Sequence, residues 1–151
     1  MRIYQWDSDS SSWNQLGSDI DGEAAGDESG SSVSLSSDGS VVAIGARYNT
    51  GSNGHNSGHT RIYRWNGTAW NQLGSDIDGE AEHDHSGSST SLSTDGNIVA
   101  IGARYNDGVD AGGPWPRAGE KKGHTRIYAW NGTAWVQRGS DIDGRIAGDL
   151  S

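Results

Sequence analysis

The sequence predicts an all-β protein, and three observations support that prediction. The chain repeats itself: the motif Ser-Asp-Ile-Asp-Gly begins at residues 18, 75 and 140, so one unit spans about 60 residues. Within a unit, short segments rich in Val, Ile, Tyr and Trp alternate with Asp-Gly or Asn-Gly pairs, which favour β-hairpin turns. No segment carries apolar residues at helical spacing over ten residues, so we expect almost no helix.

Each unit contains four predicted strands, named a to d in chain order. Strand a is rich in Ser, and an Asp-Gly turn links it to the apolar strand b. Strand c carries the repeated motif His-Thr-Arg-Ile-Tyr, and an Asn-Gly turn links it to strand d. The predicted ranges are 31–36 and 88–93 for strand a, 41–46 and 98–103 for strand b, 2–6, 60–65 and 125–130 for strand c, and 13–16, 69–73 and 134–138 for strand d.

Four antiparallel strands in a unit of this length are typical of a β-propeller blade. The small side chains of strand a suit the crowded centre of a propeller, and the Trp and Tyr residues of strands c and d suit its wider outer part. A flat β-sandwich is the alternative fold. We predict one repeat domain over residues 1–151, made of a half blade at 1–22, a blade at 31–79 and a blade at 88–144.

The blade count predicts association. Closed propellers need roughly four to eight blades, so two and a half blades cannot close alone. Either copies of the chain assemble into an oligomer or a fibre, or the chain is a fragment of a longer propeller. Because an open blade leaves unpaired edges and exposed faces, we expect assembly in both cases.

Composition and charge exclude several classes of protein. The apolar fraction is only 31%, which rules out a thick Leu-rich core, and the absence of Cys excludes disulfides and thiolate sites. No run of 18 apolar residues could form a transmembrane helix, and no signal peptide is visible at the start of the chain. A formal net charge of −9 argues against nucleic acid as a partner.

The segment 29–47 resembles the FG-GAP repeats of integrin alpha-chain propellers and of bacterial surface proteins. Ser-Gly stands at 29–30 where that family has Phe-Gly, and Gly-Ala-Arg stands at 45–47 where it has Gly-Ala-Pro. The resemblance covers essentially the whole chain. It implies a propeller, cell adhesion or ligand binding, and an extracellular or cell-surface setting. The family's calcium loop lies between strands a and b, where this chain has only a tight turn, so that site is not expected here.

The long polar loops, which follow strands b and d, are expected on one rim of the stacked sheets, and function usually lies on such loops. Carboxylates cluster there around the Asp-Ile-Asp-Gly motif, and Ca²⁺ prefers six to eight oxygen ligands. Alternatively, Asp-Gly only forms turns while the Ile of each motif anchors the loop. The third copy has Arg145 in place of Glu, which weakens a repeated site. The candidate calcium ligands are Asp19, Asp21, Glu23 and Asp27 in the first copy and Asp76, Asp78, Glu80 and Asp84 in the second.

Other polar residues have simpler interpretations. His55, His83 and His85 are expected to be exposed loop residues, because nothing makes three or four zinc ligands converge. The Arg residues at the ends of strands b and c are expected to pair with loop Asp residues rather than to bind anions. We expect no enzyme activity, because no nucleophile elbow is present and carboxylates made equivalent by repetition do not offer the two environments of acid–base catalysis.

The loop at 107–123 is the only locally basic, aromatic stretch of an otherwise acidic rim. Its two prolines flank a Trp, and Trp and Arg dominate binding hot spots, so we expect it to contact a partner. Alternatively, the Trp folds back onto its own blade. The candidate contact residues are Trp115, Arg117, Lys121 and Lys122. We therefore predict a non-enzymatic propeller repeat module that binds a protein or glycan and self-associates; the alternatives are a structural subunit and a calcium-dependent lectin-like or hydrolytic site.

Overall fold

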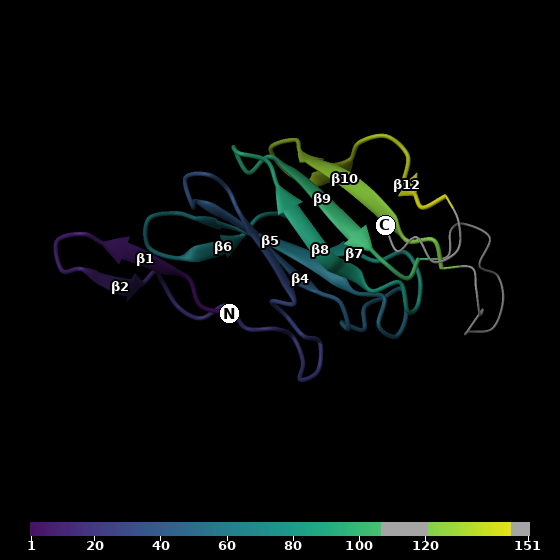
Figure 1. Ribbon diagram of the computed structural model, residues 1–151, viewed down its shortest axis with the longest axis horizontal. Helices are drawn as coiled ribbons and strands as arrows, with labels where there is room; N and C mark the ends of the chain where they lie inside the picture. Colours follow the sequence, from purple (N-terminus) through teal and green to yellow (C-terminus); the bar gives the residue numbers. More distant parts are fainter. Residues whose placement is uncertain (107–120, 146–151) are drawn as a thin grey trace.

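The structure is a computed structural model, and it describes residues 1–106 and 121–145. Within these ranges the regular structure consists of strands, which confirms the all-β prediction. The units follow one another along the longest axis of the molecule (Figure 1). The strands are β1 (Tyr4–Asp7), β2 (Ser12–Gln15), β3 (Ser32–Leu35), β4 (Val41–Ala46), β5 (His59–Trp65), β6 (Trp70–Gln72), β7 (Ile77–Asp78), β8 (Ser86–Leu92), β9 (Ile98–Ala103), β10 (His124–Trp130), β11 (Trp135–Gln137) and β12 (Ile142–Asp143).

The described strands form three antiparallel sheets, none of which closes. The half unit is the β1–β2 hairpin, the first complete unit is β3-β4-β5-β6, and the second is β8-β9-β10-β11. This is the predicted strand order, with ends that agree within about two residues. Two short strands were not predicted: β7 pairs with the start of β5, and β12 with the start of β10. Both lie in the Asp-Ile-Asp-Gly motif, where the chain turns back to the sheet that it has just left.

Turn chemistry explains the hairpins. Gly39 has a φ of 70° and Gly67 a φ of 99°, which is the left-handed region that glycine adopts without strain. Asp38 Oδ1 accepts a hydrogen bond from the Ser40 amide at 2.9 Å, and Asn66 Oδ1 accepts two from the amides that follow it. The second complete unit repeats both arrangements.

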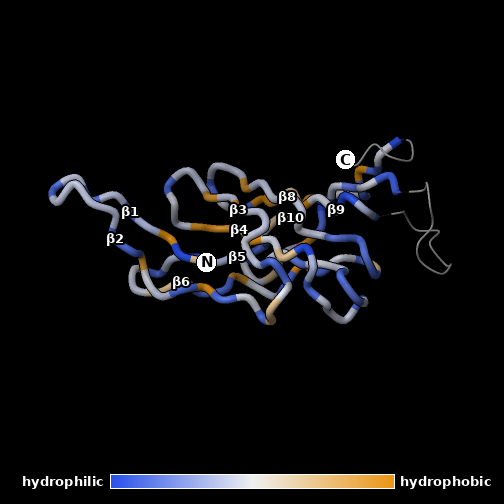
Figure 2. The backbone as a smooth tube through the Cα atoms, turned by 60° about the horizontal axis from the view of Figure 1, so that its bottom comes forward, coloured by the Kyte–Doolittle hydropathy of each residue, from blue (hydrophilic) through white to orange (hydrophobic). Residues whose placement is uncertain are grey.

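The hydrophobic core lies between neighbouring units rather than inside one of them. Alternate residues of β4 point to opposite faces of its sheet. Val41 and Ala43 belong to the core shared with the second complete unit, whereas Val42 and Ile44 belong to the core shared with the half unit. All six residues of β4 are therefore buried, and hydrophobic colour runs along this strand in Figure 2. Thin cores of this kind explain how a chain with so few apolar residues folds.

Strands β4 and β8 approach each other so closely that glycine is required between them. A Cβ atom built on Gly45 would lie 2.1 Å from the carbonyl oxygen of Gly87. Ser32 on β3 donates a hydrogen bond from Oγ to the same carbonyl at 2.8 Å. The small residues thus lie where the units are most crowded, as the composition of strand a predicts. No helix in the described ranges has the length and apolar character needed to cross a bilayer.

Candidate functional site

An ion network joins the half unit to the first complete unit at the ends where the long loops gather. Arg61, near the start of β5, donates from Nε and Nη2 to Asp76 at 3.0 and 2.9 Å, and it also donates to Glu23 of the preceding unit. Burial opposes ionisation of Asp76, but hydrogen bonds from Arg61 and Gln72 hold its pKa below the usual value. His59 lies beside this network, with Nδ1 3.6 Å from Asp76 Oδ2.

The next junction repeats the network with the same residue types. Arg126 Nη1 lies 3.5 Å from Glu80 Oε1, while Nη2 donates to the main-chain oxygen of Asp78 at 2.8 Å. His124 Nδ1 lies 3.7 Å from Glu80 and 3.5 Å from Asp141. Burial, followed by the neighbouring Arg126 cation, lowers the pKa of His124, so its ring is neutral at pH 7. Arg61 and Arg126 therefore pair with loop carboxylates, as the sequence predicts.

Two buried asparagines complete these networks, and sequence reasoning missed both. Asn49 donates from Nδ2 to Glu23 at 2.9 Å and to Asp27 at 3.0 Å, and only 3% of its surface is exposed. Asp27 also accepts a hydrogen bond from the Ala24 amide. Asn106 repeats this role in the second complete unit. The signal was present in the sequence, because Tyr-Asn follows strand b in both complete units.

The carboxylates proposed as calcium ligands are largely engaged by donors of the protein itself. Six of the eight accept hydrogen bonds from such donors. Asp21 is exposed, and burial raises the pKa of the half-buried Asp78. The donors are Arg2 and Gln15 for Asp19, Arg61 and Asn49 for Glu23, Asn49 and the Ala24 amide for Asp27, Arg61 and Gln72 for Asp76, Asn106 for Glu80, and Asn106 and the Ala81 amide for Asp84.

Groups of three potential metal ligands do occur in the described part of the chain, but they join different loops. In each group the ligand atoms lie within 4.8 Å of one another. Two of the groups contain the arginine-bound carboxylates, whose negative charge is already offset by the guanidinium group. The groups are Glu23, His59 and Asp76; Glu80, His124 and Asp141; and His55, Glu82 and His83.

His85 differs from the expectation of an exposed loop residue. It is buried between Tyr48 and Tyr105, whose ring centroids lie 4.9 and 4.8 Å from its own in edge-to-face geometry. Burial, followed by the nearby Arg104 cation, lowers the pKa of His85 to about 4. The repeat pattern did not indicate that His85 is buried, because Tyr48 and Tyr105 come from other loops.

Two of the four predicted contact residues of the basic loop can be placed. Lys121 lies with Nζ 4.2 Å from the centroid of the Tyr105 ring, a cation–π contact. Lys122 is exposed. Trp115 and Arg117 lie outside the described residues.

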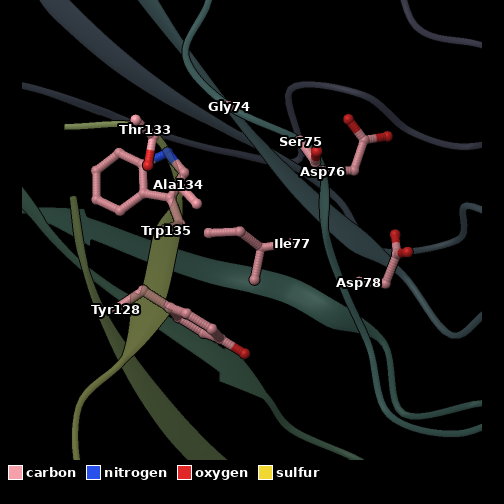
Figure 3. Close-up of a pocket in the computed structure, with 9 residues that line it drawn as sticks. All are labelled: Gly74, Ser75, Asp76, Ile77, Asp78, Tyr128, Thr133, Ala134 and Trp135. Carbon is pink, nitrogen blue, oxygen red and sulfur yellow. The ribbon is translucent and has the colours of Figure 1, made fainter. Parts of the chain in front are cut away.

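A pocket of about 320 Å³ opens at the junction between the two complete units. Its lining combines the end of the first unit, around β7, with β10 and β11 of the second. In Figure 3, Ile77 lies between the rings of Trp135 and Tyr128, and the carboxylates of Asp76 and Asp78 lie on the far side of Ile77 from these rings. The preceding junction carries the same residue types in the same order, namely Asp19, Ile20, Asp21, Tyr63 and Trp70.

Comparisons with models of known protein families and with curated protein sequences gave no match.

Proposed function

We propose that the chain is a non-enzymatic repeat module of a β-propeller of the FG-GAP type, which binds a glycan or protein ligand where its units meet. The observation that carries this proposal is the junction pocket, whose lining combines the Trp135 and Tyr128 rings with the Thr133 side chain. Two carboxylates complete the lining on the far side of Ile77 from these rings. Apolar walls with a few polar groups are typical of ligand pockets, and a volume of about 320 Å³ lies at the small end of their range.

The pocket favours a sugar over an extended peptide. The apolar face of a sugar ring packs on an aromatic ring, while its hydroxyl groups donate to carboxylates and exchange hydrogen bonds with hydroxyl side chains. Since the lining residue types recur at the preceding junction, we expect a second pocket of this kind there. A glycan with repeated sugar units gains affinity by occupying both. The cell-surface setting that the resemblance implies is part of the same proposal.

The non-enzymatic part of the proposal is supported by the state of the carboxylates. Arg61 and Asn49 hold the acids of the first junction in fixed ion pairs and hydrogen bonds, and the second junction repeats the pattern. General acid–base catalysis requires two carboxylates in contrasting environments, one of which retains a proton. Asp76 and Asp78 do differ in the direction of their pKa shifts, but Arg61 already occupies the Asp76 carboxylate that would have to act as the base.

Filling the pockets one at a time tests the binding role. Ala134 lines the pocket and is exposed, and Ala69 holds the matching position at the preceding junction. With a panel of oligosaccharides as probes, calorimetry should give two sites for the unchanged chain, one for Ala134→Trp or Ala69→Trp, and none for the double variant. Binding that is unchanged in the double variant, or no binding to any probe, would contradict the proposal.

A second candidate function, that of a structural subunit that assembles with its own copies, is favoured by the exposed aromatic residues of the half unit. Large aromatic side chains dominate the energetics of protein cores and interfaces. Trp6 and Trp13 are nevertheless 51% and 65% exposed. Such a patch marks an interaction surface.

A further inference from the structure

The units inside the chain are joined by a contact between a pair of tryptophans and a glycine. Trp65 and Trp70 of the first complete unit lie with ring centroids 5.4 Å apart and close over Gly17 of the half unit. A Cβ atom on Gly17 would lie 2.8 Å from Cζ3 of Trp65, so no side chain fits there. Trp70 also donates a hydrogen bond from Nε1 to the carbonyl oxygen of Leu16 at 2.9 Å.

The second junction reproduces this contact closely. Trp130 and Trp135 have ring centroids 5.6 Å apart and close over Gly74, where a Cβ atom would lie 2.8 Å from Cζ3 of Trp130. Trp135 donates from Nε1 to the carbonyl oxygen of Leu73 at 2.7 Å. The contact is therefore a fixed docking element of the repeat rather than a feature of one interface.

The two ends of the described chain carry the two halves of the same element. Gly139 has a φ of 74°, against 77° for Gly17 and 79° for Gly74, and no atom is found within 4 Å of a Cβ built on it. At the other end, Trp6 and Trp13 form a pair with ring centroids 5.4 Å apart, and both are exposed. Within residues 1–106 and 121–145, no tryptophan pair thus covers Gly139, and the Trp6–Trp13 pair covers no glycine.

The sheet face beside Gly139 is also uncovered. Ile142 is 55% exposed, whereas Ile77, its counterpart in the first complete unit, is 6% exposed. Ile127 is half-buried, whereas its counterpart Ile62 is fully buried in the core between units. This face of the second complete unit therefore carries the same apolar residues as the face of the first complete unit that the second one covers.

We propose that the chain associates head to tail with a second copy of itself, with the Trp6–Trp13 pair of one copy seated on Gly139 of the other. This inference rests on the assembly role proposed above and gives its register. A second copy is the occupant because it presents the same paired tryptophans, in the same order, that cover this glycine position twice inside the chain. In this register, Trp13 Nε1 donates to the carbonyl oxygen of Arg138, the position that corresponds to Leu16 and Leu73.

A head-to-tail contact uses two different surfaces, so it produces rings or open filaments rather than only dimers. The contact between copies differs from the internal junctions in two respects. The half unit has no counterparts of β3 and β4, so it covers less of the open face than a complete unit does. Inside the chain, Glu23 pairs with Arg61 across the junction. In the proposed register the corresponding residues are Arg145 and Arg2, which repel each other. The contact between copies is therefore weaker than the internal junctions, and added salt strengthens it.

Sedimentation velocity over a concentration series tests the register on the full chain. The unchanged protein should associate. Trp13→Ala and Gly139→Asn should each weaken association at least about tenfold, since asparagine tolerates a positive φ yet places a side chain on the seat. Gly39→Asn is the matched control, because Gly39 also has a positive φ with open space around it, and it should leave association unchanged.

A gain-of-function variant keeps the test decisive if Gly139→Asn fails to fold. Arg145→Glu should tighten association several-fold by restoring the ion pair, and adding Arg2→Ala should remove the gain. Association that none of these changes affects would overturn the register while leaving the assembly role intact. A monomer at every concentration, in the unchanged chain and in Arg145→Glu, would overturn both.

Discussion

Replacing Asn49 by alanine should be among the most damaging single changes at the junction networks, although the residue carries no charge. The buried Asp27 loses a hydrogen bond of 3.0 Å, and bonds to charged groups contribute roughly 1.5–3 kcal/mol. The bond to Glu23 adds little, because 47% of that side chain is exposed and water takes over. We therefore expect Asn49→Ala to lower the free energy of unfolding by about 2–3 kcal/mol.

Urea denaturation followed by tryptophan fluorescence measures this loss. Asn14→Ala is the control, because Asn14 is exposed and its bond to Asp7 is 3.4 Å long; it should cost less than about 0.5 kcal/mol. Asn49→Asp adds a third carboxylate and should be worse than alanine at pH 7. Its pKa in the folded state is then raised above the unfolded value, so the penalty fades as the pH falls toward 4. A loss below about 0.5 kcal/mol in Asn49→Ala, or an Asn49→Asp variant with no pH dependence of its own, would refute the reasoning.

Three further outcomes are expected. Gly45→Ala should destabilise the protein by about 3 kcal/mol in the same urea assay, because its Cβ would collide with the Gly87 carbonyl oxygen; a neutral effect would mean that the strands can separate. Neither a chelator nor added calcium should change the unfolding temperature, because only a ligand that binds the folded state would raise it. A shift in either case would show that calcium binds. His85 should titrate near pH 4 by NMR, and because its pKa is lowered in the folded state, it should make stability rise with pH between about 4 and 6.5; a normal pKa would show that water reaches the ring between Tyr48 and Tyr105.

The strands were predictable because their signals are local. Asp38 and Asn66 fix their turns by accepting hydrogen bonds from amides two or three residues away. Each turn motif also recurs in the next unit, which distinguishes it from a chance occurrence of Asp-Gly or Asn-Gly. The site was less predictable, because its contacts are distant in sequence. Glu23 meets Asp76 through Arg61 only because the loop of one unit crosses the start of β5 in the next, and nothing in a single loop encodes that. Loop spacing therefore placed Glu23 with Asp27, which share Asn49, but it could not indicate that Glu23 also meets Asp76.

The strand β4 has its two faces buried in two different cores, so the sheet of the first complete unit is shared between its two neighbours. The stability of a sheet in that position depends on both neighbours, because the loss of either one exposes one row of its apolar residues. Unfolding then resembles the melting of a short one-dimensional array, in which opening starts at the outer sheets and moves inward. The amide protons of β4 should consequently be the last to exchange with solvent, and those of β1 and β2 among the first, so that protection from exchange is greatest in the middle sheet.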